Sequence, residues 1–523
     1  MSCACLTPSW LEKVMLSIGA KDSELSNSTL SQSNTLEQHK NTTDIKFEND
    51  SELNPLSNQT TLVQGGFLYT ADANNTVIAD SWVLIKGSEI IAIGSSDDPI
   101  PEHDKLVDAK GKLLLPGLIN PHWHESFVAP CHESADDSGI KPTAYSNGGD
   151  IAALGAMFGF ISGVGQKLTL DEGIAIARWS MWTQLRSGTT ALGDVGSANK
   201  ADAMATAAIE LGMRLRVSRW GSDIMLPDGT GNYKTIADTQ EQTNDWVALI
   251  ENWHEHSSGL VGAMPSVMGA FGSSDAQLLS LAEIAHKFNV PYATHLAPLK
   301  NERAAVEAVF GKSPIQRFDD MGLLTDRLLA VHTAYASEAE YQRLIATGVN
   351  ICHSPAHYGM LGERTVSETG QLGRFLKDGV WVSTSTDGDI SFIGGMCEAM
   401  RGAHLGHNEA QNCNTACPPT LALKTGSLFG AKALGWHDKI GSIEIGKQAD
   451  LVLVNADDYR YKLGNHPLRT YLVTGSSHDV NSVMVAGEWL VKNGRSTRFD
   501  EAELFADYEK AVVSARARIG GPS

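Results

Sequence analysis

The chain has 523 residues, of which 42% are hydrophobic and 20% charged, so it can bury a sizeable core and has the composition of a globular enzyme. Its 61 acidic residues outnumber 41 basic ones and give a formal net charge of −20. Such a surface repels nucleic-acid phosphates and anionic membranes, so we expect a small-molecule substrate and neither a nucleic-acid nor a membrane partner. The seven cysteines show no regular spacing, which favours a reducing, cytoplasmic location.

The two ends of the chain differ from its middle. Residues 1–60 are rich in Ser, Thr, Asn and Gln and poor in aromatic residues, a composition typical of disorder. Short β-strands punctuated by Gly and Asn then fill residues 61–115. A second β pattern occupies residues 439–498, and we expect a final helix over 499–523.

Between the two β segments, strands and helices alternate over residues 116–438, which predicts an α/β fold of the (β/α)₈ TIM-barrel type. Helices are indicated by 3.6-residue periodicity over 170–187, 201–211 and 275–288. The eight predicted barrel strands are Leu113–Ile119, Thr189–Asp194, Arg214–Trp220, Leu260–Val267, Val290–His295, Leu328–His332, Val349–His353 and Val380–Gly388.

Several of these strands lead into a polar residue. The first continues to His122 and His124, and because alternate strand residues share a face, the two imidazoles point together. Taken alone, this pair fits two hydrogen-bonded core histidines equally well. His295, His332 and Asp387 end three later strands, however, and the carboxyl ends of barrel strands meet at one face. Together they predict a mononuclear catalytic metal site with a position left for water.

The pattern resembles the amidohydrolase superfamily, in its branch of triazine hydrolases, guanine deaminase and adenosylhomocysteine deaminase-like enzymes. The resemblance covers residues 61–500 and rests on Pro-Gly-Leu-Ile-Asn-Pro-His-Trp-His at 116–124, on the strand-end residues, and on the tail segment 439–452. It implies that the two β segments pair into one small β domain, built from both chain ends, beside the barrel.

By this resemblance, His122, His124, His295 and Asp387 bind one divalent metal ion, with zinc as the first choice and iron as the alternative. Asp387 would also take a proton from the attacking water, and His332 would orient the water and the developing oxyanion. Members of the superfamily with two metal ions carry a carboxylated Lys at the end of strand 4. Residues 262–268 contain no Lys, so we expect a single ion.

The chain departs from its branch after strand 5. Many deaminases of the branch have a Glu three residues after the strand-5 His, and that Glu handles protons of the leaving group. Here Pro298 occupies the position. Glu302 is one candidate replacement, although a helix starting near it would turn it away from the metal. Asp387 and Glu125 are the other candidates.

Further candidate substrate contacts are His357 and Tyr358, which follow strand 7 where the branch usually has an Asn-Pro-x-Ser-Asn-like loop; a purely structural loop is the alternative. Trp123, Cys131 and His132 complete the candidate contacts. The segment that follows Cys131 is either a lid over the site or an insertion packed on the barrel rim.

Two histidines outside this pattern, His404 and His407, lie three residues apart in a predicted helix. We expect them at the surface or at an interface.

The sequence thus predicts a metal-dependent hydrolase that cleaves a C–N bond of a small cyclic or heteroaromatic compound, as an aminohydrolase or amidohydrolase. Displacement of a halide, which needs no protonation as it leaves, tolerates Pro298 and is the first alternative. A non-catalytic metal-binding barrel is the alternative from another class. We also expect a homo-oligomer.

Overall fold

The computed structural model of the protein describes residues 58–125, 146–155, 163, 165, 167–197, 199–226, 232–388, 394–464 and 466–519. Residues 1–57 of the N-terminal segment predicted to be disordered, and the predicted contacts Cys131 and His132, lie outside these residues.

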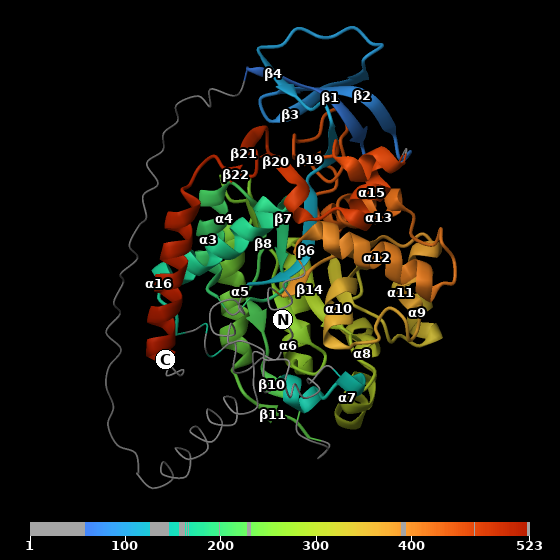
Figure 1. Ribbon diagram of the computed structural model, residues 1–523. Helices are drawn as coiled ribbons and strands as arrows, with labels where there is room; N and C mark the ends of the chain where they lie inside the picture. Colours follow the sequence, from blue (N-terminus) through green and yellow to red (C-terminus); the bar gives the residue numbers. More distant parts are fainter. Residues whose placement is uncertain are drawn as a thin grey trace, which may run out of the picture.

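A nine-stranded sheet joins the two ends of the chain, as blue and red strands at the top of Figure 1. Its order is β22-β21-β20-β19-β5-β1-β2-β3, with β4 beside β1. The two ends meet where β19 runs antiparallel to β5, with Val452 opposite Leu115. This confirms the small β domain built from both chain ends. The strands are β1 (Thr60–Tyr69), β2 (Val77–Lys86), β3 (Glu89–Ser95), β4 (Lys105–Asp108), β5 (Lys112–Pro116), β19 (Leu451–Asn455), β20 (Val480–Val485), β21 (Glu488–Lys492) and β22 (Arg495–Ser496).

The strand predicted over Leu113–Ile119 is divided at Gly117, so this predicted boundary is wrong. β5 belongs to the nine-stranded sheet, whereas the next strand, β6 (Leu118–His124), belongs to the barrel. A Cβ atom on Gly117 would lie 2.2 Å from Thr190 Oγ1 and 3.0 Å from Asp450 Cβ. Only glycine therefore lets the chain pass between barrel and sheet at this point.

The barrel strands are parallel and lie in two sheets, β12-β8-β7-β6-β18 and β17-β16-β15-β14-β13-β9. The third, fourth and eighth predicted strands are each interrupted and contribute one segment to each sheet, which links the two into a TIM-type barrel. In the fourth strand the interruption contains Pro265, which has no N–H for the ladder. The segments are β7 (Thr189–Asp194), β8 (Arg214–Val217), β9 (Trp220–Gly221), β12 (Val261–Ala263), β13 (Ser266–Gly269), β14 (Tyr292–Leu296), β15 (Leu328–His332), β16 (Asn350–His353), β17 (Val382–Thr384) and β18 (Asp387–Gly388).

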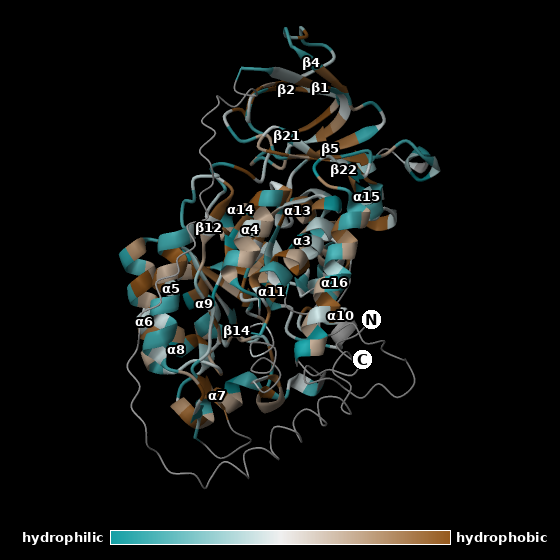
Figure 2. Cartoon of the chain, turned by 90° about the vertical axis from the view of Figure 1, so that its left-hand side faces the viewer, coloured by the Kyte–Doolittle hydropathy of each residue, from teal (hydrophilic) through white to brown (hydrophobic). Residues whose placement is uncertain are grey.

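Helices surround the barrel strands and carry both hydrophobic and hydrophilic residues along their length, as α5 and α6 show in Figure 2. Several begin at a capping side chain, such as Thr169 of α3 and Ser337 of α9, each with a complete capping box. A short hairpin, β10 (Ile224–Met225) with β11 (Lys234–Thr235), lies outside the barrel sheets. The helices are α3 (Leu170–Arg186), α4 (Ala201–Leu211), α5 (Thr239–Trp253), α6 (Asp275–Phe288), α7 (Glu302–Phe310), α8 (Pro314–Asp320), α9 (Glu338–Thr347), α10 (Pro355–Leu361), α11 (Gln371–Lys377), α12 (Met396–Ala410), α13 (Pro419–Thr425), α14 (Leu428–Ala433), α15 (Pro467–Thr474) and α16 (Glu501–Ile519).

The C-terminal helix α16 packs along α3 (Figure 1). Ala511, Val512 and Ala515 of α16 form an apolar cluster with Ala175 and Ile176 of α3. At the end of α16 the Arg518 guanidinium donates to both Glu172 carboxylate oxygens, each at 2.6 Å.

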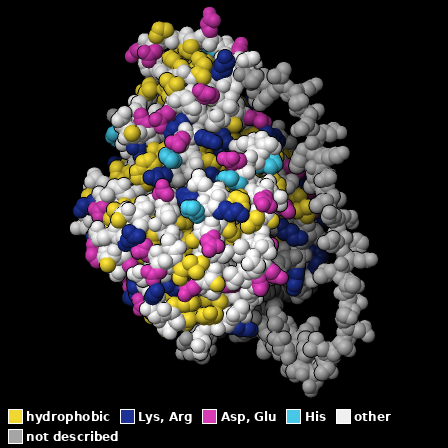
Figure 3. All heavy atoms as spheres, turned by 180° about the vertical axis from the view of Figure 1, so that it is seen from behind, with side chains coloured by type: hydrophobic (Ala, Val, Ile, Leu, Met, Phe, Trp, Pro, Cys, Tyr) yellow, Lys and Arg dark blue, Asp and Glu magenta, His cyan; other side chains and the backbone are white. Residues whose placement is uncertain are grey.

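On the face seen in Figure 3, acidic and basic side chains are interspersed. No helix of the described residues is long and apolar enough to cross a membrane.

Candidate metal centre and active site

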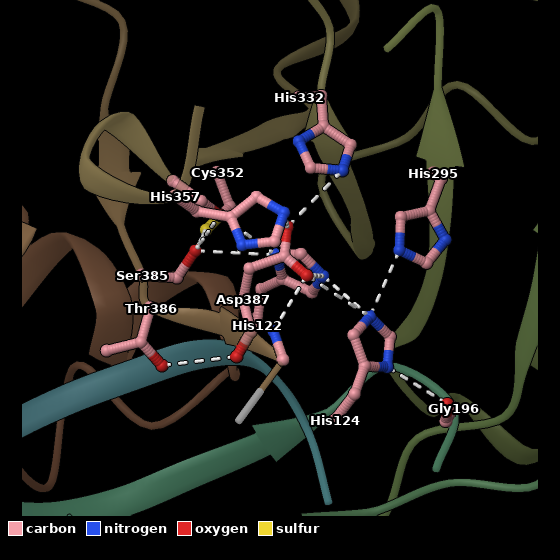
Figure 4. A network of polar contacts seen from close by, with 12 residues as sticks. His122, His124, Gly196, His295, His332, Cys352, His357, Ser385, Thr386 and Asp387 are labelled. Atoms are coloured by element: carbon pink, nitrogen blue, oxygen red, sulfur yellow. Dashed lines mark hydrogen bonds and ion pairs between the residues drawn. The ribbon is translucent and has the colours of Figure 1, made fainter. Parts of the chain in front are cut away.

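Five predicted site residues meet at the carboxyl ends of the barrel strands (Figure 4). His122 and His124 lie on β6, His295 on β14, His332 at the end of β15 and Asp387 on β18. All five residues are buried. The donor atoms of His122, His295 and His332, and those of His122, His124 and Asp387, each lie within 4.8 Å of one another.

The tautomers of His124 and His295 show what this cluster can hold. The Nδ1 of His124 lies 2.9 Å from the Gly196 carbonyl oxygen, and the Nδ1 of His295 lies 2.9 Å from that of Met268. Carbonyl oxygens only accept hydrogen bonds, so each Nδ1 carries the proton and each Nε2 presents a lone pair. These two Nε2 atoms are 3.2 Å apart. Two lone pairs so close repel each other unless a cation lies between the rings, so this donor set fits a metal ion.

His122 is the third histidine whose Nε2 points into this cluster. Its Nε2 lies 2.8 Å from the Nε2 of His124, while its Nδ1 faces the hydroxyls of Ser354 and Ser385 at 3.3 and 3.4 Å. Burial lowers the pKa of His122 well below its usual value. Burial and the adjacent His124 lower the pKa of His295 to about 4. Both rings are therefore neutral at pH 7, the form that binds metal.

The two carboxylate oxygens of Asp387 face different groups. Oδ1 lies 3.7 Å from the Nε2 of His122 and 3.9 Å from that of His124. Oδ2 lies 3.8 Å from the Nε2 of His332 and 3.5 Å from that of His357. Burial opposes ionisation of Asp387, but the surrounding imidazoles prevail and lower its pKa to about 2. One oxygen thus faces the predicted ligands His122 and His124, and the other faces His332 and His357.

The backbone is strained at two of these residues. His332 and Asp387 have φ angles of 72° and 64°, in the left-handed region that non-glycine residues rarely adopt. Thr333, which follows His332, also has a positive φ of 46°. Strain of this kind persists where the surrounding structure holds it, and it is concentrated at functional sites.

Helix α10 brings His357 and Tyr358 to the same site. The Tyr358 hydroxyl lies 2.7 Å from the Nδ1 of His332, and Figure 4 shows the His357 ring beside Asp387. Burial and the nearby Glu363 carboxyl raise the pKa of Tyr358 well above its usual value, so this phenol keeps its proton. Both residues lie beside the predicted catalytic groups, in positions where they can contact a substrate.

The remaining candidates among the described residues are Trp123, Glu302 and Glu125. Trp123 is fully buried in the main hydrophobic core, which leaves it no surface for a substrate. Glu302 is the first residue of α7. Burial raises its pKa to about 8, and the charges that oppose this rise are those of Arg303 and Arg317, not groups of the metal site. Glu125 is buried directly after His124, with its backbone N–H donating to Ser197 Oγ.

The predicted surface position of His404 and His407 is wrong. Both are buried on α12: the Nδ1 of His404 faces the Cys417 carbonyl at 2.6 Å, and the Nε2 of His407 faces that of His353 at 3.3 Å. The helix packs this face inward, so two histidines three residues apart did not mark an exposed face.

Three further residues near the site were not among the predicted site residues. The Asp194 carboxylate accepts hydrogen bonds from Gly196 N–H and Ser197 Oγ, and so holds the turn whose carbonyl faces His124. Its place at the end of β7 is the signal that could have identified it. The Trp220 ring stacks on His124 with ring centroids 5.6 Å apart. Glu363, beyond the end of α10, lies 3.9 Å from His357 through its Oε1.

Comparisons with known proteins show the family and the fold of the chain. The profile of the amidohydrolase family matches residues 113–490. A 5-methylthioadenosine/S-adenosylhomocysteine deaminase from Acetivibrio thermocellus is 26% identical over 85% of this chain and 96% of its own length. Among solved structures, an adenosine deaminase from Xanthomonas campestris with bound zinc superimposes with a TM-score of 0.73, at 23% identity over 88% of this chain and all of the other. An atrazine chlorohydrolase from Arthrobacter aurescens in complex with zinc gives 0.74, at 22% identity over 86% and 100%.

The family match spans the barrel and strands β19 and β20 of the sheet that joins the chain ends, and it includes every residue of the metal cluster. The structural neighbours share the fold. The buried histidine and aspartate cluster, the fold and the family match lead to one conclusion: the chain belongs to the amidohydrolase family and is a metal-dependent hydrolase acting on carbon–nitrogen bonds.

Proposed function

We propose that the protein is a zinc-dependent aminohydrolase that removes an amino group, as ammonia, from a small heteroaromatic compound of the adenine type. The observation that carries the proposal is that the Nε2 lone pairs of His124 and His295 face each other, with the Asp387 carboxylate beside them. The names of the curated relatives, which are 5-methylthioadenosine/S-adenosylhomocysteine deaminases, support the substrate class.

One ion fits the donor set, held by His122, His124, His295 and Asp387. Nitrogen and oxygen donors suit zinc and also iron, and zinc is preferred because two structural neighbours contain it. Bound there, the ion supplies Lewis acidity that lowers the pKa of a water molecule from about 15.7 towards 7.

The protein's own groups then handle the protons. Asp387 Oδ2, on the side away from the ligands His122 and His124, accepts a proton from the attacking water. Tyr358 keeps its proton and donates a hydrogen bond to the Nδ1 of His332, so His332 carries its own hydrogen on Nε2. That N–H points towards the Oδ2 side and stabilises the developing oxyanion.

An amine leaving group is preferred to a halide. Pro298 removes the usual acid and would suit halide displacement, but the deaminase relatives favour ammonia release. A non-catalytic barrel is less well supported, because a structural role would need neither the strained His332 nor the strained Asp387.

The test is product release from purified protein, metal-free and reloaded with zinc. We expect ammonia from 5′-methylthioadenosine, S-adenosylhomocysteine or adenosine only after reloading. His122→Ala, which removes a ligand, should abolish release. Chloride release from atrazine without ammonia from any aminopurine would support the halide alternative instead, and activity independent of metal would contradict the proposal.

The proposal also includes the location of the protein and its oligomeric state. The cysteine usage and net charge support a cytoplasmic enzyme, and we retain the predicted homo-oligomer. Analytical ultracentrifugation of the full chain tests the second.

A further inference from the structure

An amine leaves carbon only if it is protonated, and the residue that usually supplies this proton is replaced here by Pro298. A replacement must be a buried acid on the same side of the site as Asp387 Oδ2, since that oxygen faces the reacting groups. Glu363 meets both conditions.

The end of α10 holds Glu363 in place. Gly362 adopts the left-handed conformation with φ 72°, and the Glu363 N–H donates to the Tyr358 carbonyl at 3.0 Å. This is the Schellman turn that commonly ends a helix. One short helix and its final turn therefore carry three groups of the site, His357, Tyr358 and Glu363.

The Glu363 side chain is only 3% exposed. Its Oε1 lies 3.9 Å from the Nε2 of His357, the nitrogen that is 3.5 Å from Asp387 Oδ2. Its Oε2 accepts a hydrogen bond from the Thr365 hydroxyl. Burial and the negative charge of Asp387 raise the pKa of Glu363 to about 8, so its carboxyl is protonated at neutral pH.

We propose that Glu363 is the acid of this site and donates its carboxyl proton to the departing amino group. This inference rests on the proposed aminohydrolase activity and names the residue that makes an amine, rather than a halide, a competent leaving group.

The steps balance as follows. Water attacks the amino-bearing carbon, a C–O bond forms, and one water proton passes to Asp387. The Glu363 proton is transferred to the amino nitrogen, the C–N bond breaks, and ammonia departs with that electron pair. The proton on Asp387 then returns to Glu363. Both carboxyl groups lie near the Nε2 of His357, Asp387 Oδ2 at 3.5 Å and Glu363 Oε1 at 3.9 Å. Amine and water become hydroxyl product and ammonia, and both carboxyl groups are restored.

The chain contains a matched comparison. Glu302 is also fully buried, and burial raises its pKa to about 8 as well, despite the nearby Arg303 and Arg317. Among the described residues, neither of its carboxylate oxygens has a hydrogen-bond partner. Burial thus raises the pKa of both acids, but their neighbours differ: of the two, Glu363 is the one that lies beside His357, which faces Asp387.

The experiment compares Glu363→Gln with Glu302→Gln on two substrates, adenosine and 6-chloropurine riboside, after zinc content and melting temperature are matched to the wild type. Glu363→Gln should lower ammonia release about 10²- to 10⁴-fold and leave chloride release within a few-fold, because chloride departs without a proton. Glu302→Gln should change neither. If Glu363→Gln fails to fold, Glu363→Asp should give the same leaving-group dependence with a smaller loss.

Unchanged ammonia release in a folded Glu363→Gln enzyme would overturn the inference, and so would equal losses on both substrates, which indicate a structural role. An infrared measurement is independent of turnover. At pH 7 the wild type should show protonated-carboxyl bands, of which Glu363→Gln and Glu302→Gln each remove one. If Glu363 is ionised at pH 7, the inference is rejected, whether or not the wild type releases ammonia. If the wild type releases no ammonia, that result counts against the proposed function alone.

Discussion

The Nε2 atoms of His124 and His295 lie 3.2 Å apart although each imidazole carries its proton on Nδ1. Two imidazole rings do not hold their lone pairs face to face without a cation between them, and the carbonyls of Gly196 and Met268 prevent either ring from turning its proton inward. Backbone carbonyls of the barrel therefore orient both rings so that their Nε2 atoms form a site for a cation.

The first prediction concerns this site. Removal of metal by a chelator should lower the melting temperature, because the ion stabilises only the folded chain. Elemental analysis should find one divalent ion per chain in the wild type and much less in His124→Ala. His437→Ala, at a half-exposed histidine paired with Asp438, serves as the control and should keep its ion. Two tightly held ions per fully active chain would contradict the single-site assignment.

The second prediction concerns proton transfer by Asp387. Asp387→Asn retains an oxygen near the ligands but removes the base, so turnover should fall about 10²- to 10⁴-fold. Steady-state kinetics at matched zinc occupancy is the measurement. A variant that binds zinc normally and turns over at the wild-type rate would show that another group accepts the water proton.

The third prediction concerns His332. His332→Ala removes the group that faces Asp387 Oδ2 and should lower kcat about 10²- to 10³-fold, as the loss of a preorganised oxyanion donor does. The substitution also relieves no left-handed strain, because alanine carries a Cβ too. Melting temperature should therefore change little compared with kcat, and a large loss of stability with normal turnover would reverse the assignment.

The fourth prediction concerns the ion pair between Arg518 of α16 and Glu172 of α3. Hydrogen bonds from Arg518 lower the pKa of Glu172 from 4.5 to about 2. A carboxyl whose pKa is lower in the folded chain stabilises it above pH 4.5, and this contribution disappears as the pH falls towards 2. Glu172→Gln should thus lower the melting temperature at pH 7, and the difference from wild type should shrink in acid. A difference independent of pH would mean that charge plays no part.

The fifth prediction concerns the N-terminal segment. Its polar composition cannot bury enough apolar surface to offset the entropy of ordering, so deletion of residues 2–57 should leave melting temperature and turnover nearly unchanged. Calorimetry and kinetics of the truncated chain measure both, and a large loss of either would show that the segment contributes.

Much of the architecture was predictable, because it follows from the periodicity of hydrophobic residues within short segments of the sequence. β7, β15, α4 and α6 have the predicted bounds, since period-2 and period-3.6 hydrophobicity are properties of short segments. The clustering of His122, His124, His295, His332 and Asp387 could be predicted because each follows an apolar strand and the ends of barrel strands meet.

What the sequence left open depends on contacts between distant segments. The break at Gly117 follows from the close approach of Thr190 and Asp450, which no local pattern reveals. The burial of His404 and His407 depends on which face of α12 meets the barrel. Glu363 lies 65 residues beyond Pro298 in the sequence, and only the turn after α10 carries its carboxyl to His357. An acid is recognised as part of a site by its neighbours, and neighbours far apart in sequence are brought together by the fold.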